Sequence, residues 1–111
     1  MIFSMLTAWW RRLRRRRAFK NVIFVESMTF IPKHLGSDVY IVRRGGLDRR
    51  AVLNCPCRCG RRIDLSLVKG QEHHWLATIQ HGKISLNPSI WLRVGPCRSH
   101  FFVRDSKVLW V

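Results

Sequence analysis

The chain has 111 residues, of which 47% are hydrophobic and 11% aromatic, so it suits one folded domain with a modest core and excludes a disordered chain or two domains. Its 21 lysines and arginines face only 6 acidic residues, giving a formal charge of +15 that favours an anionic partner: nucleic acid, a membrane surface or an acidic protein. An arginine-rich genome would raise the charge in the same way without any nucleic-acid function.

Residues 1–20 form a hydrophobic and basic N-terminal segment with its own character. Apolar side chains recur at helical spacing from Ile2 to Leu13 and predict an amphipathic basic helix. The apolar run is too short to span a bilayer, which needs about 20 residues. The helix can instead lie at a membrane interface, or pack on its own domain or a partner. The candidate contacts for an anion, a nucleic acid or a peripheral membrane are Arg11, Arg12, Arg14, Arg15, Arg16 and Arg17.

From residue 21 onward the chain consists of short β-branched and aromatic runs separated by glycine and proline. In chain order the predicted strands cover residues 22–25, 28–31, 38–42, 51–53, 63–67, 75–79, 84–86, 100–103 and 108–111. The last two are predicted to form a hairpin around Asp105 and Ser106. The pattern predicts an all-β or β-rich domain over residues 21–111, with short antiparallel strands in a sandwich, barrel or ribbon stack.

The four cysteines are Cys55, Cys57, Cys59 and Cys97. Three cysteines at alternate positions do not suit disulfides, because a bridge between such near neighbours is strained. The N-terminal apolar stretch precedes the basic run, which is the reverse of a secretory signal peptide. We therefore expect a cytoplasmic, reducing environment in which the cysteines are metal ligands.

The strongest chemical signal is the segment Cys55-Pro56-Cys57-Arg58-Cys59-Gly60, together with the distant Cys97-Arg98-Ser99-His100. Alternate residues of an extended segment project to one face, so the three clustered thiols can converge. Gly60 permits a tight turn behind them. Tetrahedral zinc takes four ligands, whereas the candidates number five: Cys55, Cys57, Cys59, Cys97 and His100.

The spacing does not identify the four ligands. We favour Cys57, Cys97 and His100 as members, with Cys55 and Cys59 contesting the last place. A histidine in the core beside Phe101 is the alternative for His100. The same ligands also permit a [2Fe–2S] cluster held by three cysteines and one histidine, although zinc suits the spacing better.

At these residues the chain resembles the bacterial domain-of-unknown-function family 6527. The shared features are Phe30-Ile31-Pro32 before Tyr40-Ile41, the cysteine cluster, Ser85-Leu86-Asn87-Pro88-Ser89-Ile90 before Cys97-Arg98-Ser99-His100-Phe101, and Val108-Leu109-Trp110. They cover about residues 24–111, and Arg58 stands where the family usually has glycine. The resemblance implies a small metal-binding protein encoded near ubiquitin-like conjugation components, with no established activity.

We expect a zinc-binding adaptor or interaction module whose protein partner, by this resemblance, belongs to a ubiquitin-like conjugation system. One alternative is an iron–sulfur redox protein. Another is a nucleic-acid-binding zinc protein in which Trp75 or Trp91 stacks on bases. Its phosphate contacts would be Arg43, Arg44, Arg49, Arg50, Arg61 and Arg62.

Enzymatic activity is left open, and the sequence favours a protein without it. Ser89 and Ser99 have no recognisable base with an orienting partner, and the chain contains only six carboxylate side chains. A closed, cysteine-rich metal site also indicates a structural ion, because catalytic zinc keeps an open position.

Overall fold

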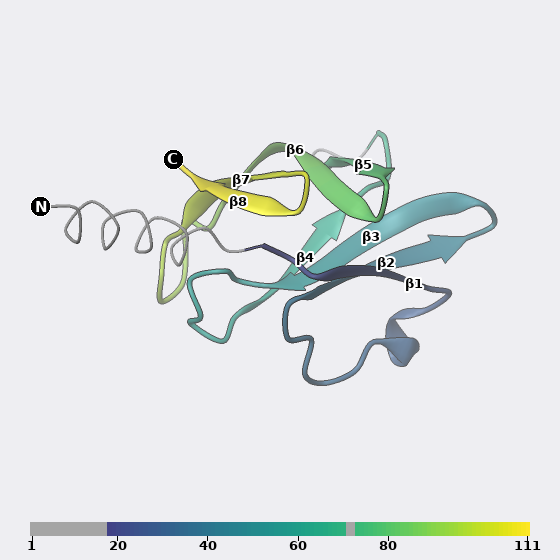
Figure 1. Ribbon diagram of the computed structural model, residues 1–111, viewed down its shortest axis with the longest axis horizontal. Coiled ribbons are helices and arrows are strands. Elements are labelled where there is room, and N and C mark those ends of the chain that lie inside the picture. Colours follow the sequence, from purple (N-terminus) through teal and green to yellow (C-terminus); the bar gives the residue numbers. More distant parts are fainter. Residues whose placement is uncertain (1–17, 71–72) are drawn as a thin grey trace, which may run out of the picture.

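The computed structural model describes residues 18–70 and 73–111, which form two four-stranded β-sheets arranged as two layers (Figure 1). The first sheet has the strand order β1-β2-β3-β4 and the second the order β5-β6-β7-β8. The strands are β1 (Asn21–Val25), β2 (Asp38–Arg44), β3 (Leu47–Asn54), β4 (Arg62–Ser66), β5 (Leu76–Gln80), β6 (Lys83–Trp91), β7 (His100–Arg104) and β8 (Lys107–Trp110). The predicted all-β fold is confirmed, whereas residues 1–17 of the helix predicted over residues 1–20 lie outside the described residues and residues 18–20 are not helical.

The pairing departs from the predicted antiparallel pattern at one place. β1 and β2 are parallel, with Asn21 beside Asp38 and Val25 beside Val42, while the other paired strands are antiparallel. A parallel pair cannot be joined by a tight hairpin, because the chain must cross back along the sheet. Residues 26–37 make this crossover between the ends of β1 and β2.

The strand predicted over residues 28–31 is wrong, because the crossover contains a short 3₁₀ helix there, η1 (Met28–Phe30). The hydroxyl of Ser27 caps it by accepting a hydrogen bond from the backbone N–H of Thr29 at 3.3 Å. This local bond gives the backbone an alternative to a strand ladder. η1 is short, and no helix of the described residues is long and apolar enough to cross a membrane.

The core lies between the two sheets and consists of the inward-facing residues of both. From the first sheet come Val39, Ile41, Ala51, Leu53, Ile63 and Leu65, and from the second Ile84, Leu86, Ile90, Phe101, Val103 and Val108. A smaller cluster covers the opposite face of the first sheet: Ile31, Leu35, Tyr40, Val42 and Val52. β2 and β3 are therefore buried on both faces, which explains their continuous apolar runs.

Replacing Phe101 gives a test of whether the core lies between the two sheets. Phe101 is fully buried, and its ring meets the ring of Trp110 edge-on with centroids 5.6 Å apart. We expect Phe101→Ala to lower the free energy of unfolding by about 3–5 kcal/mol, measured by urea denaturation. The matched control is Phe30→Ala, at a side chain that is 67% exposed, which should cost less than about 0.5 kcal/mol. Similar losses in the two variants would contradict the described core.

Candidate functional site

The thiols of all four cysteines meet where the turn between β3 and β4 approaches the turn between β6 and β7, at one end of the molecule (Figure 1). The Sγ atom of Cys55 lies 3.3 Å from that of Cys57 and 3.7 Å from that of Cys97. All four sulfur atoms lie within 4.8 Å of one another. Tetrahedral zinc with Zn–S bonds of about 2.3 Å places its sulfur ligands about 3.8 Å apart. The four cysteines can therefore hold a metal ion.

A turn, rather than the expected extended segment, gathers the first three cysteines. The backbone N–H of Cys55 donates to the carbonyl of Arg61 at 2.8 Å, and the N–H of Arg58 donates to the carbonyl of Cys55 at 3.1 Å. Gly60 has a φ of +85°, which suits the tight turn expected there. Arg58 also has a positive φ, +68°, at the position where the resembling family has glycine.

The surroundings of the thiols affect their pKa values in opposite directions. The side chain and then the backbone of Ser99 hydrogen-bond the Cys97 sulfur and lower the pKa of Cys97 to about 6. Burial raises the pKa of the Cys55 thiol to about 12. Because metals bind thiolates, Cys97 offers an ionised ligand near neutral pH. Cys55 loses its proton readily only when a cation offsets the cost of burying its charge.

His100, which we favoured as a metal ligand, is not a member of this group of four. It is the first residue of β7, and its Nε2 atom lies 2.8 Å from the Oγ atom of Ser89. Its neighbour Phe101 points into the core, and side chains alternate along a strand, so His100 points to the outer face of the second sheet. Cys97 lies in the preceding turn and can face the other cysteines. The side chains of Cys97 and His100 therefore point to different places, although the two residues are close in sequence.

The outer face of β6 and β7 carries Ser89, Trp91 and His100. Ser89 lies in a stretch where the register between β6 and β7 shifts, from the Leu86 pair to the Ile90 pair. Such bulges redirect side chains and are common beside active sites. Trp91 is directly opposite His100, and their rings stack with centroids 4.9 Å apart and an interplanar angle of 12°. The guanidinium of Arg93 also lies 4.1 Å from the centre of the Trp91 ring.

A serine hydroxyl in hydrogen-bond contact with an imidazole is the arrangement of a nucleophile and its general base. Ser89 and His100 are both half-buried, so a substrate can reach them. In residues 18–70 and 73–111 no carboxylate pairs with His100, and the stacked ring of Trp91 supports the imidazole instead.

Sequence reasoning missed the pair of Ser89 and His100, because it searched for a base with a carboxylate partner. The strand predicted over residues 84–86 stopped short of Ser89, whereas β6 continues to Trp91 and pairs there with β7, so the prediction did not place the serine opposite the histidine.

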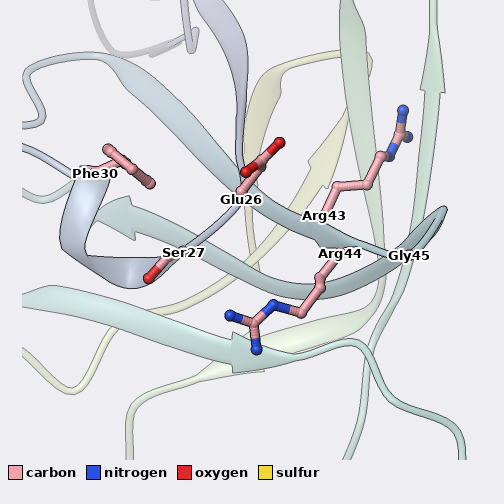
Figure 2. Close-up of a pocket in the computed structure, with 6 residues that line it drawn as sticks. All are labelled: Glu26, Ser27, Phe30, Arg43, Arg44 and Gly45. Atoms are coloured by element: carbon pink, nitrogen blue, oxygen red, sulfur yellow. The ribbon is translucent and has the colours of Figure 1, made fainter.

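An open cavity of about 390 Å³ lies where η1 approaches the hairpin of β2 and β3 (Figure 2). It is lined by Glu26, Ser27, Phe30, Arg43, Arg44 and Gly45. Figure 2 shows the side chains of Arg43 and Arg44 pointing away from one another. The lining includes the hydroxyl of Ser27, but this hydroxyl contacts Thr29 and the lining contains no histidine, so the cavity lacks the serine–histidine contact found at Ser89.

Four of the six arginines proposed as phosphate contacts between residues 43 and 62 have partners within the protein. Arg43 pairs with Asp48 at 2.6 Å, and Arg50 pairs with Asp64 at 2.8 Å. Arg62 donates to the carbonyl of Pro32 at 2.7 Å, and Arg61 donates to the carbonyl of Val94. The six arginines between Arg11 and Arg17 lie outside the described residues.

The composition of the metal site can be tested with two variants. We expect Cys97→Ser to lose bound metal, because it removes one of four converging thiols, and His100→Ala to retain it, because that imidazole contacts Ser89. The measurement is metal content per chain by elemental analysis, with the melting temperature recorded before and after chelation. Chelation should lower the melting temperature of the His100→Ala protein. Equal metal loss in the two variants would contradict the four-cysteine site.

The chain was compared with protein families, curated proteins and solved structures. Residues 25–111 match the family model described as bacterial ubiquitination-like system serine protease (BubE). No curated protein and no solved structure matches significantly. The match confirms the association with ubiquitin-like systems that the resemblance implied, whereas the family number 6527 stays a prediction. Since the match covers most of its length, the chain belongs to the BubE family, which is described in these words.

Proposed function

We propose that this protein is a serine protease acting on a component of a bacterial ubiquitin-like system, with Ser89 as nucleophile and His100 as general base. The observation that carries the proposal is the contact of 2.8 Å between Ser89 Oγ and His100 Nε2. The family description agrees with it. The protein partner expected of an adaptor becomes the substrate in this proposal.

The reaction follows from the positions of these two side chains. His100 accepts the hydroxyl proton at Nε2, which requires the tautomer protonated at Nδ1, while Ser89 Oγ attacks the scissile carbonyl carbon. The tetrahedral intermediate collapses to an ester on Ser89, and the imidazolium returns the proton to the leaving amine. Water then repeats the sequence, giving a proton to His100, releasing the carboxylic acid and restoring the hydroxyl.

We further propose that the metal ion is zinc with a structural role. Cys55, Cys57, Cys59 and Cys97 supply four thiols, which would complete a tetrahedral shell with no open position. The ion would join the turn after β3 to the turn before β7, and so fix where His100 begins its strand. Iron is the alternative, and an absorption spectrum distinguishes the two, because zinc is colourless and an iron–sulfur cluster absorbs in the visible range.

The nucleophile can be tested without knowing the natural substrate. We expect a fluorophosphonate probe to label Ser89, because the neighbouring base activates its hydroxyl. Ser89→Ala should lose labelling and at least about a thousandfold in ester hydrolysis. Ser85→Ala, on the same strand, is the matched control and should keep both. Peptide mapping by mass spectrometry locates the label, and a label elsewhere, or none, would reject the proposal.

Trp91 is proposed as a positioning residue for His100. Its ring stacks on the face of the imidazole and so limits how that ring can turn, whereas the carboxylate of a triad would orient it through a hydrogen bond to Nδ1. With p-nitrophenyl acetate, a substrate too small to need other contacts, we expect Trp91→Ala to lower kcat by about tenfold with little change in KM. Trp91→Phe keeps a flat ring and should restore most of kcat. A loss that phenylalanine does not restore would contradict the positioning role.

A further inference from the structure

We propose that the substrate binds as an extended segment between two open strand edges beside Ser89, with an apolar side chain in the cavity between them and an acidic residue next to it. This proposal rests on the proposed protease function in one respect, namely that the bound segment is cleaved at Ser89. Binding itself depends on the edges and the cavity, so the two can be tested separately.

The first open edge is the part of β4 from Arg62 to Asp64, since β4 is the last strand of its sheet and the carbonyl of Ser66 beyond this part already accepts from the backbone N–H of Trp75. The N–H of Cys55 bonds the carbonyl of Arg61, and the N–H of Leu67 bonds the carbonyl of Arg49. The odd-numbered residues of β4 therefore direct their backbone groups toward β3, because these groups alternate sides in an antiparallel pair. It follows that the backbone N–H and C=O groups of Arg62 and Asp64 face the open edge.

The second open edge is the end of β6. Its pairing with β5 stops at Leu76 and Asn87, although β6 continues to Trp91. The N–H of Leu92 bonds the carbonyl of Ser99, so the backbone groups of Ser89 and Trp91 point away from β7. The indole N–H of Trp75 confirms this direction by donating to the Ser89 carbonyl at 3.4 Å.

The two edges border one cavity of about 190 Å³. Its lining includes Arg61 and Arg62 from the side of β4, and Trp75, Ile90, Trp91 and Leu92 from the other side. Pockets for whole small-molecule ligands are usually about 300–1,000 Å³, so this one suits a single side chain. Since most of these residues are apolar and Trp91 also stacks on His100, an apolar side chain here would lie close to the reactive pair.

The charge around the cavity is positive. Asp64 also lines it, but its charge is compensated by Arg50 at 2.8 Å. The guanidinium groups of Arg61 and Arg62 donate hydrogen bonds to main-chain carbonyls. Because these carbonyls are neutral, the bonds leave both positive charges uncompensated. An acidic residue beside the apolar one is therefore the complementary choice.

The addition of a strand to an open edge gives affinity through main-chain hydrogen bonds, while side-chain pockets give selectivity. An open edge is also a liability, because it can pair with other chains. The β4 edge borders the cavity, and Trp91 on the other side of the cavity stacks on His100, so a substrate strand explains why the edge is open here.

The test uses Ser89→Ala as the background in every protein, so that cleavage plays no part. Asp64→Pro removes the N–H that faces the open edge, and Asp64→Ala keeps that N–H while losing the same ion pair with Arg50. The probe is acetyl-Gly-Glu-Leu-Glu-Gly-amide, with acetyl-Gly-Lys-Leu-Lys-Gly-amide as its charge-reversed control. Binding is measured by tryptophan fluorescence, and thermal unfolding confirms that both variants are folded.

We expect the Asp64→Ala protein to bind the glutamate peptide, and the Asp64→Pro protein to bind it at least about fivefold more weakly. The lysine peptide should bind both more weakly still. Equal affinity of the two folded variants, equal affinity for the two peptides, or no binding to the Asp64→Ala protein would overturn the proposal. If Asp64→Pro unfolds, Arg62→Pro against Arg62→Ala tests the other outward-facing N–H under the same criteria. Failure of Ser89 to react with the fluorophosphonate probe would instead overturn the protease function alone.

Discussion

The convergence of four thiols at one end of the sandwich is the constraint on which the rest of the site depends. Cys55, Cys57 and Cys59 belong to the turn that closes the first sheet, and Cys97 belongs to the turn that joins β6 to β7. The sulfur atoms therefore meet where the two sheets approach one another at the end of the shared core, which includes Cys55 and packs against Cys97. Because Cys97 precedes β7 by only three residues, the same contact fixes where that strand begins, and with it the position of His100.

Strand alternation separates the structural and reactive groups of the second sheet. Ile90 and Phe101 fill the core as a cross-strand pair, and their neighbours Trp91 and His100 form the next pair on the outer face. This second pair makes no backbone hydrogen bonds between its own residues, since the carbonyl of His100 bonds the N–H of Val111. Side chains approach most closely at such positions, which explains why the two rings stack.

Features that depend on the local pattern of residues, such as the strands, were predicted from the sequence. Features that depend on which strand pairs with which, and in what register, were missed. Alternating apolar residues located most strands, and the spacing of the cysteines pointed to the group of four thiols that could hold a metal ion. The strand over residues 28–31 failed because Ser27 caps a short helix there. The contact between His100 and Ser89 was missed for a different reason: the Cys97-to-His100 spacing resembles a ligand pair. Only the register of β6 against β7 shows that the imidazole faces Ser89.

The adaptor and protease hypotheses differ in what the outer face must do. An adaptor needs an exposed anchor, and Trp91, which is 53% exposed, would serve. It does not need a serine hydroxyl 2.8 Å from the imidazole on which that tryptophan stacks. The bulge that directs Ser89 toward His100 costs regular pairing within β6, which recognition alone does not require. Catalysis gives both the bulge and the contact a purpose, and the open strand edges beside them give a substrate chain a place to lie.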